Sequence, residues 1–328
     1  MKLAPAQRFE IKDAGQKQFH RIVLFNSGTV VGYYSQEDTC YLAWFNGNDI
    51  TTTKVDNLAC DFFSLPAFFH FQNYAGLYSS KNDSITLYSE ADKSTPISIV
   101  ITNQLPKAKY PNFDRVLSNY HTAGNTDNNV IPILFTNGGL LPVYVANLQI
   151  DMEKKTATWL DLKYWNNKQP IPLENENFDK PQKPFTMLHA LNKQHTTYLY
   201  GIGDRDGGYL KPGMEFSELS AVDEKGTVKE TLFSLGRLYK DSKKGGKECT
   251  FSSSGKYAIL TPAFKSDDWK NKQKLFELDS KEILDLELPK GLSDYRVIDH
   301  NNEVFLLVNK HPNLVFAGSD SLIICNVG

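Results

Sequence analysis

The chain has 328 residues, of which 41% are apolar and 23% charged, so it is long enough to bury a large core. Its 36 lysine and arginine residues nearly cancel its 38 aspartate and glutamate residues, which leaves a formal net charge of -2. Such a balance excludes a global field that would draw the protein to nucleic acid or to an anionic membrane, and we expect neither as a partner.

The first residues, MKLAPAQR, turn polar before an apolar stretch of signal-peptide length has formed, and no later run is long enough to span a membrane. We therefore expect a cytoplasmic protein. The four cysteines lie far apart and form no Cys-x-x-Cys pair, so buried thiols in strands are expected, with a disulfide or a metal site as the alternatives. They are Cys40, Cys60, Cys249 and Cys325.

After residues 3–12, the chain contains two units of four short β-rich runs, each in the order strand, turn, strand, loop, strand, turn, strand. The first unit comprises residues 20–25, 29–35, 39–46 and 50–55. The second unit comprises residues 68–72, 74–79, 84–89 and 96–101.

The third unit is less regular. Its first two strands are expected at residues 113–120 and 129–135, and its outer hairpin at 142–150 and 156–162. Residues 163–184 contain several prolines and few apolar residues, so we expect a long connection over one face of the fold.

Three further units complete the chain. The fourth is predicted at residues 185–190, 196–203, 215–222 and 227–233, and the fifth at 248–251, 256–263, 274–278 and 283–288. The last unit has only three strands, at residues 295–299, 303–309 and 321–327. We predict that residues 3–12 supply its fourth strand, because this pairing would close a ring and leave no open seam.

The fifth unit resembles a blade of the tryptophan-aspartate repeat β-propellers. The resemblance lies in Phe251-Ser252, in Gly255-Lys256-Tyr257, and in the run from Leu275 to Asp279. It implies an all-β propeller, and the count of units predicts that residues 1–328 form a single six-bladed β-propeller domain closed by the N-terminal strand. Seven blades are the alternative, if residues 163–184 or the segment before Phe68 contain strands. The resemblance implies no particular activity, because propellers of one shape have unrelated functions.

In a propeller, the connections between second and third strands and those between blades gather on one face, where binding residues are expected. Asp204-Arg205-Asp206-Gly207 is similar to a calcium loop but lacks the further acidic ligands, so no metal site is predicted. Arg205 and Tyr209 are instead expected to anchor a partner, as these residue types dominate binding hot spots. The full predicted partner-binding set is Trp165, Asp204, Arg205, Asp206, Tyr209, Asp267, Asp268 and Trp269.

Motifs of enzyme chemistry are missing from the sequence. The seven histidines show no metal-ligand spacing, and no nucleophile elbow, phosphate loop or dinucleotide fingerprint occurs, so no catalytic residue and no cofactor is predicted. We expect a non-enzymatic, protein-binding propeller that is monomeric on its own, most specifically an immunity or inhibitor protein that neutralises a bacterial toxin. The alternatives are a general scaffold and a lyase or glycoside hydrolase that uses Asp204, Asp206, Asp267 and Asp268.

Overall fold

A computed structural model describes most of the chain. The described residues are 1–46, 49–56, 58, 66–80, 82–104, 115–116, 129–136, 143–166, 169–172, 185–191, 197–203, 205–206, 209–210, 215–222, 228–234, 248–261, 273–309 and 321–328. Their only helical element is the short 3-10 helix η1 (Ala14–Gln16), and the regular structure is otherwise β-strand.

The strands form four-stranded antiparallel units, which we number I to VI along the chain. Units I and II comprise β2 (Gln18–Leu24), β3 (Val30–Gln36), β4 (Thr39–Asn46), β5 (Asp49–Val55), β6 (Ala67–Phe71), β7 (Tyr74–Ser79), β8 (Ser84–Ser89) and β9 (Pro96–Ile101). Units III and IV comprise β10 (Arg115–Val116), β11 (Val130–Thr136), β12 (Val143–Asp151), β13 (Thr156–Asn166), β15 (Phe185–Leu191), β16 (Thr197–Gly203), β19 (Glu215–Val222) and β20 (Val228–Ser234).

Unit V comprises β21 (Glu248–Phe251), β22 (Tyr257–Thr261), β23 (Lys274–Glu277) and β24 (Ile283–Asp285). Unit VI comprises β25 (Tyr295–Asn301), β26 (Val304–Asn309), β27 (Ser321–Val327) and β1 (Leu3–Glu10).

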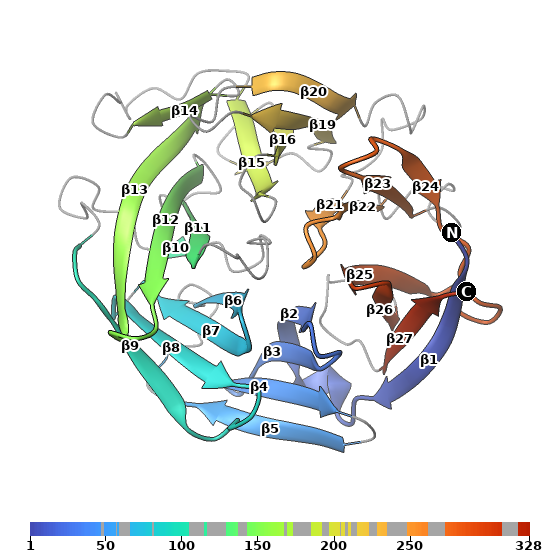
Figure 1. Cartoon of the computed structure of the whole chain (residues 1–328), viewed down its shortest axis with the longest axis horizontal. Coiled ribbons are helices and arrows are strands. Elements are labelled where there is room, and N and C mark those ends of the chain that lie inside the picture. Colours follow the sequence, from blue (N-terminus) through green and yellow to red (C-terminus); the bar gives the residue numbers. More distant parts are fainter. Residues whose placement is uncertain are drawn as a thin grey trace.

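The units stand around a common axis, with the first strand of each unit innermost and the last outermost (Figure 1). This arrangement is a β-propeller, which confirms the predicted fold. Residues 59–65 and 173–184, where the sequence left room for a seventh unit, lie outside the described residues.

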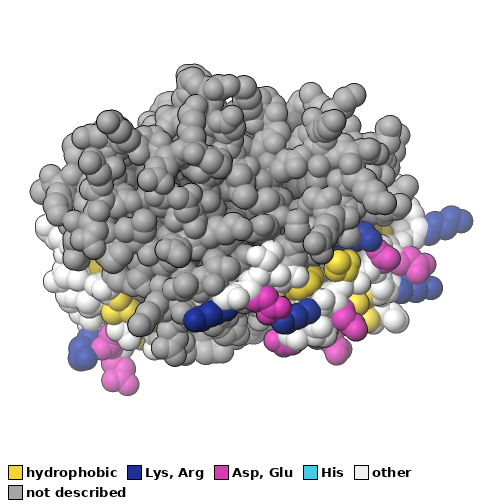
Figure 2. Space-filling view, turned by 90° about the horizontal axis from the view of Figure 1, so that it is seen from above, with side chains coloured by type: hydrophobic (Ala, Val, Ile, Leu, Met, Phe, Trp, Pro, Cys, Tyr) yellow, Lys and Arg dark blue, Asp and Glu magenta, His cyan; other side chains and the backbone are white. Residues whose placement is uncertain are grey.

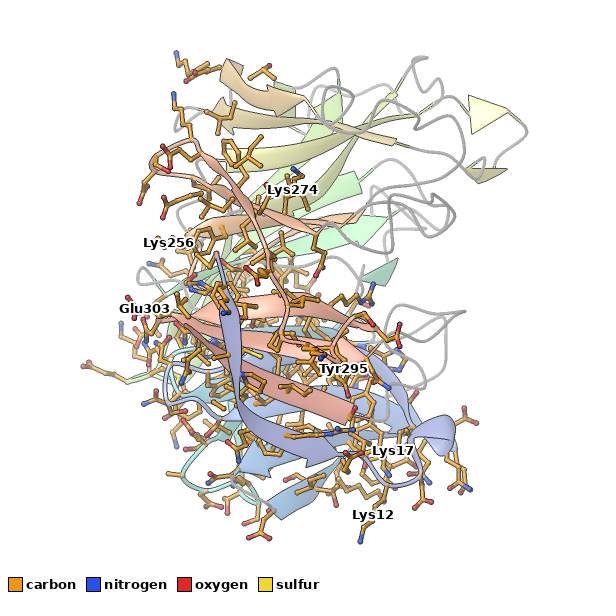
Figure 3. All side chains as sticks on the ribbon, turned by 90° about the vertical axis from the view of Figure 1, so that its right-hand side faces the viewer. Lys12, Lys17, Lys256, Lys274, Tyr295 and Glu303 are labelled. Carbon is orange, nitrogen blue, oxygen red and sulfur yellow. The ribbon has the colours of Figure 1, made fainter. Side chains whose placement is uncertain are left out.

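Strand β1 closes the ring, as the sequence predicted. It pairs antiparallel with β27, from Leu3 opposite Val327 to Glu10 opposite Ser321. The N-terminal residues also contact unit V, because Leu3 N donates to Glu287 O at 3.0 Å and Glu287 N donates to Met1 O at 2.8 Å. Figure 3 views the ring from the side of this closure, which joins units V and VI by backbone hydrogen bonds.

Units II and III are joined in a similar way. Their outermost strands β9 and β13 pair in parallel, with Val100 opposite Thr156. Val100 N donates to Lys155 O at 3.0 Å and Thr102 N donates to Ala157 O at 2.8 Å. The two units therefore share one nine-stranded sheet, in which the ninth strand is β14 (Gln169–Pro172), paired with β13.

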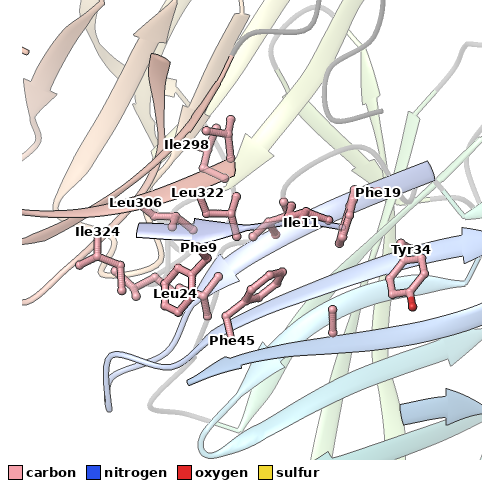
Figure 4. Close-up of a cluster of buried hydrophobic side chains, with 14 of the residues drawn as sticks. Phe9, Ile11, Phe19, Leu24, Tyr34, Phe45, Ile298, Leu306, Leu322 and Ile324 are labelled. Carbon is pink, nitrogen blue, oxygen red and sulfur yellow. The ribbon is translucent and has the colours of Figure 1, made fainter. Parts of the chain in front are cut away.

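The core lies between neighbouring units, because successive side chains of a strand point to opposite faces and both faces are covered. In β2, Ile22 and Leu24 pack toward unit VI, in a cluster that contains Leu322 (Figure 4). Val23 and the following Phe25 pack toward unit II, in a cluster that contains Phe68. An unbroken apolar run such as IVLF is thus the pattern of a strand buried on both sides.

The cysteines differ in part from the expectation of buried thiols. Cys325 is free and buried, as expected. Cys40 is disulfide-bonded, which corrects the expectation for this residue, since spacing in the sequence does not reveal which sulfurs the fold brings together. The Tyr33 hydroxyl lies 3.0 Å from Cys40 Sγ. Cys60 and the side chain of Cys249 lie outside the described part of the structure.

Candidate functional site

The two faces of the ring differ in their connections. Strand direction alternates within each unit, so the first-to-second and third-to-fourth connections emerge on one face, which we call the turn face. The second-to-third connections and the links between units emerge on the other, which we call the loop face.

Side chains on the turn face join neighbouring units. Asn301 Nδ2 of unit VI donates to Asn26 Oδ1 of unit I at 2.7 Å. Ser27 Oγ of unit I donates to Glu90 Oε1 of unit II at 2.6 Å. Gln72 Nε2 of unit II donates to Asn129 Oδ1, which precedes β11 of unit III, at 2.9 Å.

The same face carries two further links. Ser254 Oγ of unit V lies 2.9 Å from His300 Nδ1 of unit VI. Lys281 Nζ of unit V lies 2.8 Å from Glu230 Oε2 of unit IV. Side-chain contacts on the turn face therefore connect unit IV to V, V to VI, VI to I, I to II, and II to III.

Several connections on the loop face are long. Residues 235–247, 262–273 and 310–320 each separate two successive described strands on this side, whereas residues 72–73 and 302–303 suffice on the turn face. The long connection of residues 117–129 is an exception on the turn face. Most of the long stretches between described strands thus fall on the loop-face side of the ring.

Of the predicted partner-binding residues, the structure places three in a small ribbon on the loop face. Strands β17 (Arg205–Asp206) and β18 (Tyr209–Leu210) pair between β16 and β19, with Asp206 opposite Tyr209. The expected polar connection is therefore a β-ribbon. Asp204, Asp267, Asp268 and Trp269 lie outside the described residues.

Trp165 requires a correction, because it does not lie in a loop. Strand β13 continues to Asn166 and pairs with β14 (Gln169–Pro172), which sets Trp165 opposite Pro170. The proline content of this segment suggested a connection, but proline is compatible with an edge strand such as β14. Trp165 lies at the loop-face end of the outermost strand of unit III.

A buried carboxylate, which sequence reasoning missed, joins three units near the turn face. Asp299 of β25 is only 3% exposed, and it accepts hydrogen bonds from Leu24 N of unit I at 2.8 Å and from Ser253 N of unit V at 2.7 Å. It also accepts from the Ser253 hydroxyl and from its neighbour His300 N. Burial raises the pKa of Asp299, and these hydrogen bonds oppose the rise.

The guanidinium of Arg21 lies in the same region. Arg21 Nη1 donates to Phe68 O of unit II at 2.9 Å. Burial lowers the pKa of Arg21 to about 10, and the charge of Asp299 opposes this effect, so the guanidinium stays charged at neutral pH. The sequence signal for this buried charge was the position of Arg21 next to the apolar run of the strand HRIVLF.

This cluster does not have the geometry of a catalytic triad. A triad needs a carboxylate on one imidazole nitrogen and a serine hydroxyl on the other. Here Ser254 Oγ occupies His300 Nδ1, and the Asp299 carboxylate is directed to Ser253 and Leu24 instead. The His300 ring packs against Tyr257, with ring centroids 4.7 Å apart, and is 3% exposed. These contacts of Asp299 and His300 join units V, VI and I.

Other site types are also missing from the described residues. No group of three His, Cys, Asp or Glu side chains among them could hold a metal ion. None of their helices is long and apolar enough to cross a membrane. Among the described side chains that are coloured in Figure 2, basic and acidic ones are interspersed.

The structure thus defines a β-propeller whose loop face carries the long connections. No family model matches the chain, and no curated protein matches it. Similar solved structures include a catalytically inactive virginiamycin B lyase from Staphylococcus aureus with quinupristin, at 10% identity and a TM-score of 0.48, covering 98% of this chain and 99% of that one. Another is the Cps50 (Swd1) β-propeller domain of Myceliophteria thermophila, at 9% identity and a TM-score of 0.44, covering 94% and 84%. A third is YCF48 bound to D1 peptide, at 7% identity and a TM-score of 0.42, covering 99% and 97%.

Proposed function

We propose that this chain is a non-enzymatic binding protein whose protein partner contacts the loop face. The observation that carries the proposal is the difference between the two faces. Turn-face side chains are engaged with one another, as between Asn26 and Asn301, whereas the long connections emerge on the loop face. Binding residues concentrate on loops that a rigid scaffold positions.

Within this face, we place the centre of contact on the β17–β18 ribbon of unit IV and on Trp269 from the neighbouring unit V. The ribbon carries Arg205 on β17 and Tyr209 on β18, where they stand opposite Leu210 and Asp206, respectively. Arginine, tyrosine and tryptophan are the residue types most enriched at binding hot spots. Asp204, Asp206, Asp267, Asp268 and Trp165 would surround these anchors.

The narrower proposal is an inhibitor or immunity protein that neutralises a bacterial toxin, acting as a monomer with residues 1–328 as one domain. This narrower proposal rests on the missing catalytic motifs and on the long connections of the loop face. The disulfide of Cys40 is typical of oxidising compartments, so we do not carry the cytoplasmic expectation into the proposal. The inhibitor would act in such a compartment.

Site-specific photo-crosslinking in an extract of the native host tests the binding face. A photoreactive residue replaces Glu37 or Tyr209 on the loop face, and Lys154 or Asn302 serves as the matched position on the turn face. We expect one protein to be captured from the loop-face positions only. Capture from Lys154 or Asn302 alone would place the interface on the turn face and contradict the proposal.

Titration of the captured partner tests the anchors. Truncating a buried anchor costs roughly 2–4 kcal/mol, so Arg205→Ala and Trp269→Ala should each weaken binding by roughly 30- to 1000-fold. Lys154→Ala is the control and should leave affinity unchanged. The melting temperature of all three variants should stay within a degree or two of the unsubstituted protein. Unchanged affinity in both anchor variants would refute these anchors, and turnover of a sugar or ester substrate would favour an enzyme.

A further inference from the structure

Two histidines occupy equivalent positions in units II and VI. In unit II, His70 pairs with Ala75, one pair before the strands meet the β6–β7 turn. In unit VI, His300 pairs with Phe305, again one pair before the β25–β26 turn. Both therefore lie at the turn-face end of an innermost strand, where each contacts the preceding unit.

His70 lies in the interface between units I and II. It is 1% exposed and stacks on Phe25 of unit I, with ring centroids 4.0 Å apart and planes 14° from parallel. Its Nε2 lies 2.6 Å from Gln72 O, so this nitrogen carries the proton and donates to the carbonyl. Nδ1 is buried and has no hydrogen-bond partner within the described residues.

The surroundings of His70 favour its neutral form. Burial lowers the pKa of His70 to about 4, a lowering that the positive charge of Arg21 reinforces, whereas the Gln72 carbonyl and the charge of Glu90 oppose it. A second ring proton on Nδ1 would need an acceptor that this buried position does not provide, and an unsatisfied buried donor is costly.

His300 lies in the interface between units V and VI. Its ring meets Tyr257 of unit V edge-on at 4.7 Å, and its Nδ1 lies 2.9 Å from Ser254 Oγ of the same unit. The charged groups around it are Lys256 of unit V and Asp299, which accepts its backbone N–H. Burial, reinforced by Lys256, lowers the pKa of His300 to about 4.

We propose that the ring is acid-sensitive at two defined interfaces: protonation of His70 separates unit I from unit II, and protonation of His300 separates unit V from unit VI, both at the turn face. Each histidine binds its proton near pH 6.5 when the interface is open, but only near pH 4 when it is closed. The closed form therefore loses stability as the pH falls from about 6.5 to about 4, and it is fully stabilised above that window. Neutralisation closes the interfaces again.

A third histidine provides the matched control. His20 also has its pKa lowered to about 4 by burial. Its contacts, however, are with Ser35 Oγ at 2.8 Å and with the ring of Tyr33, both in its own unit I. Replacing it should change the pH dependence of global unfolding without changing the opening of either interface.

Hydrogen exchange between pH 7 and pH 4.5, corrected for the intrinsic rate, tests the proposal by following strands β2, β6, β21 and β25. Between pH 7 and pH 4.5 the opening constant should rise by roughly 60-fold per histidine in the unsubstituted protein. His70→Phe should remove the rise in β2 and β6 and leave it in β21 and β25, and His300→Phe should do the reverse. His20→Phe should leave the rise of the opening constant unchanged at both interfaces.

Two results would overturn the proposal. One is an equal rise in all strands, including β3 and β7, since this would be global acid unfolding. The other is an unchanged rise in β2 and β6 of the His70→Phe variant. If circular dichroism shows that this variant is unfolded at pH 7, His70→Gln replaces it, because glutamine keeps a donor for the Gln72 carbonyl and does not titrate.

Discussion

The carboxylate of Asp299 accepts a hydrogen bond from the backbone N–H of Leu24 at 2.8 Å, across 275 positions of sequence. The same carboxylate accepts from Ser253, so one side chain connects the innermost strands of units VI and I to the first turn of unit V. Its three backbone donors and one hydroxyl donor match the acceptor-only character of an ionised carboxylate.

Removal of this carboxylate should be strongly destabilising. Asp299→Ala leaves buried N–H groups without an acceptor and removes the opposite charge that acts on Arg21, so we expect a loss of about 3–5 kcal/mol in the free energy of unfolding. Asp299→Asn keeps one acceptor oxygen and should cost less. Urea unfolding measures both, with the exposed Asp279→Ala as control. A cost below 1 kcal/mol for Asp299→Ala would contradict the role of this residue.

Closure by β1 predicts the effect of an N-terminal truncation. Deletion of residues 1–12 exposes the edge of β27 and removes Phe9, which is 3% exposed, from the core between units VI and I. We expect aggregation or a large drop in melting temperature.

A point substitution tests the packing of Phe9 without shortening the chain. Phe9→Ala should cost about 3–5 kcal/mol, whereas Arg8→Ala, on the exposed side of the same strand, should be near neutral. Thermal unfolding followed by circular dichroism measures both. A truncated protein with the same melting temperature as the intact protein would refute closure by β1.

The contact between Gly76 and Phe69 predicts a steric effect. These residues are directly opposed in β7 and β6, and a Cβ at position 76 would lie 2.1 Å from Phe69 Cε2. Because Phe69 is fully buried, Gly76→Ala should destabilise the protein by about 1–3 kcal/mol. Gly15→Ala, where a Cβ meets no atom within 4 Å, is the matched control. Rescue of Gly76→Ala by Phe69→Leu would establish the contact as the cause.

The disulfide of Cys40 predicts the number of free thiols. Of the four cysteines, two should react with a thiol reagent in denaturant without reductant, and all four after reduction. Cys325 should react only after unfolding, because it is buried and its pKa is raised to about 11 by burial. Four reactive thiols before reduction would show that Cys40 is not bridged.

The strands were largely predictable because their signal is local. The alternation and the turn residues gave the limits of β4, β7, β8, β9, β19 and β27 as the structure has them. Strand β1 was predictable because unit VI lacked a fourth strand. By contrast, residues 113–120 were expected to form a strand, and only β10 is described there.

Contacts between units were not predictable, since they depend on how distant strands are placed against one another. His70 stands in the sequence as a single polar residue within an apolar run, Arg21 directly precedes such a run and Asp299 directly follows one, and nothing local indicates their partners. At the loop face, a polar Asp-Arg-Asp-Gly segment indicated a turn, but pairing of Asp206 with Tyr209 depends on both sides of that turn. Trp165 was misplaced for a similar reason, because its partner Pro170 is an unusual residue for a strand.

The pairing of β1 with β27 also bears on how the protein folds as it is synthesised. Residues 3–10 leave the ribosome early, yet their partner, residues 321–327, is translated after all the other strands. Until then β1 has an open edge, and the core between units I and VI lacks Leu322 and Ile324. A nascent chain must therefore keep this strand from pairing with other chains throughout translation, and any product that stops before residue 321 retains an incomplete ring.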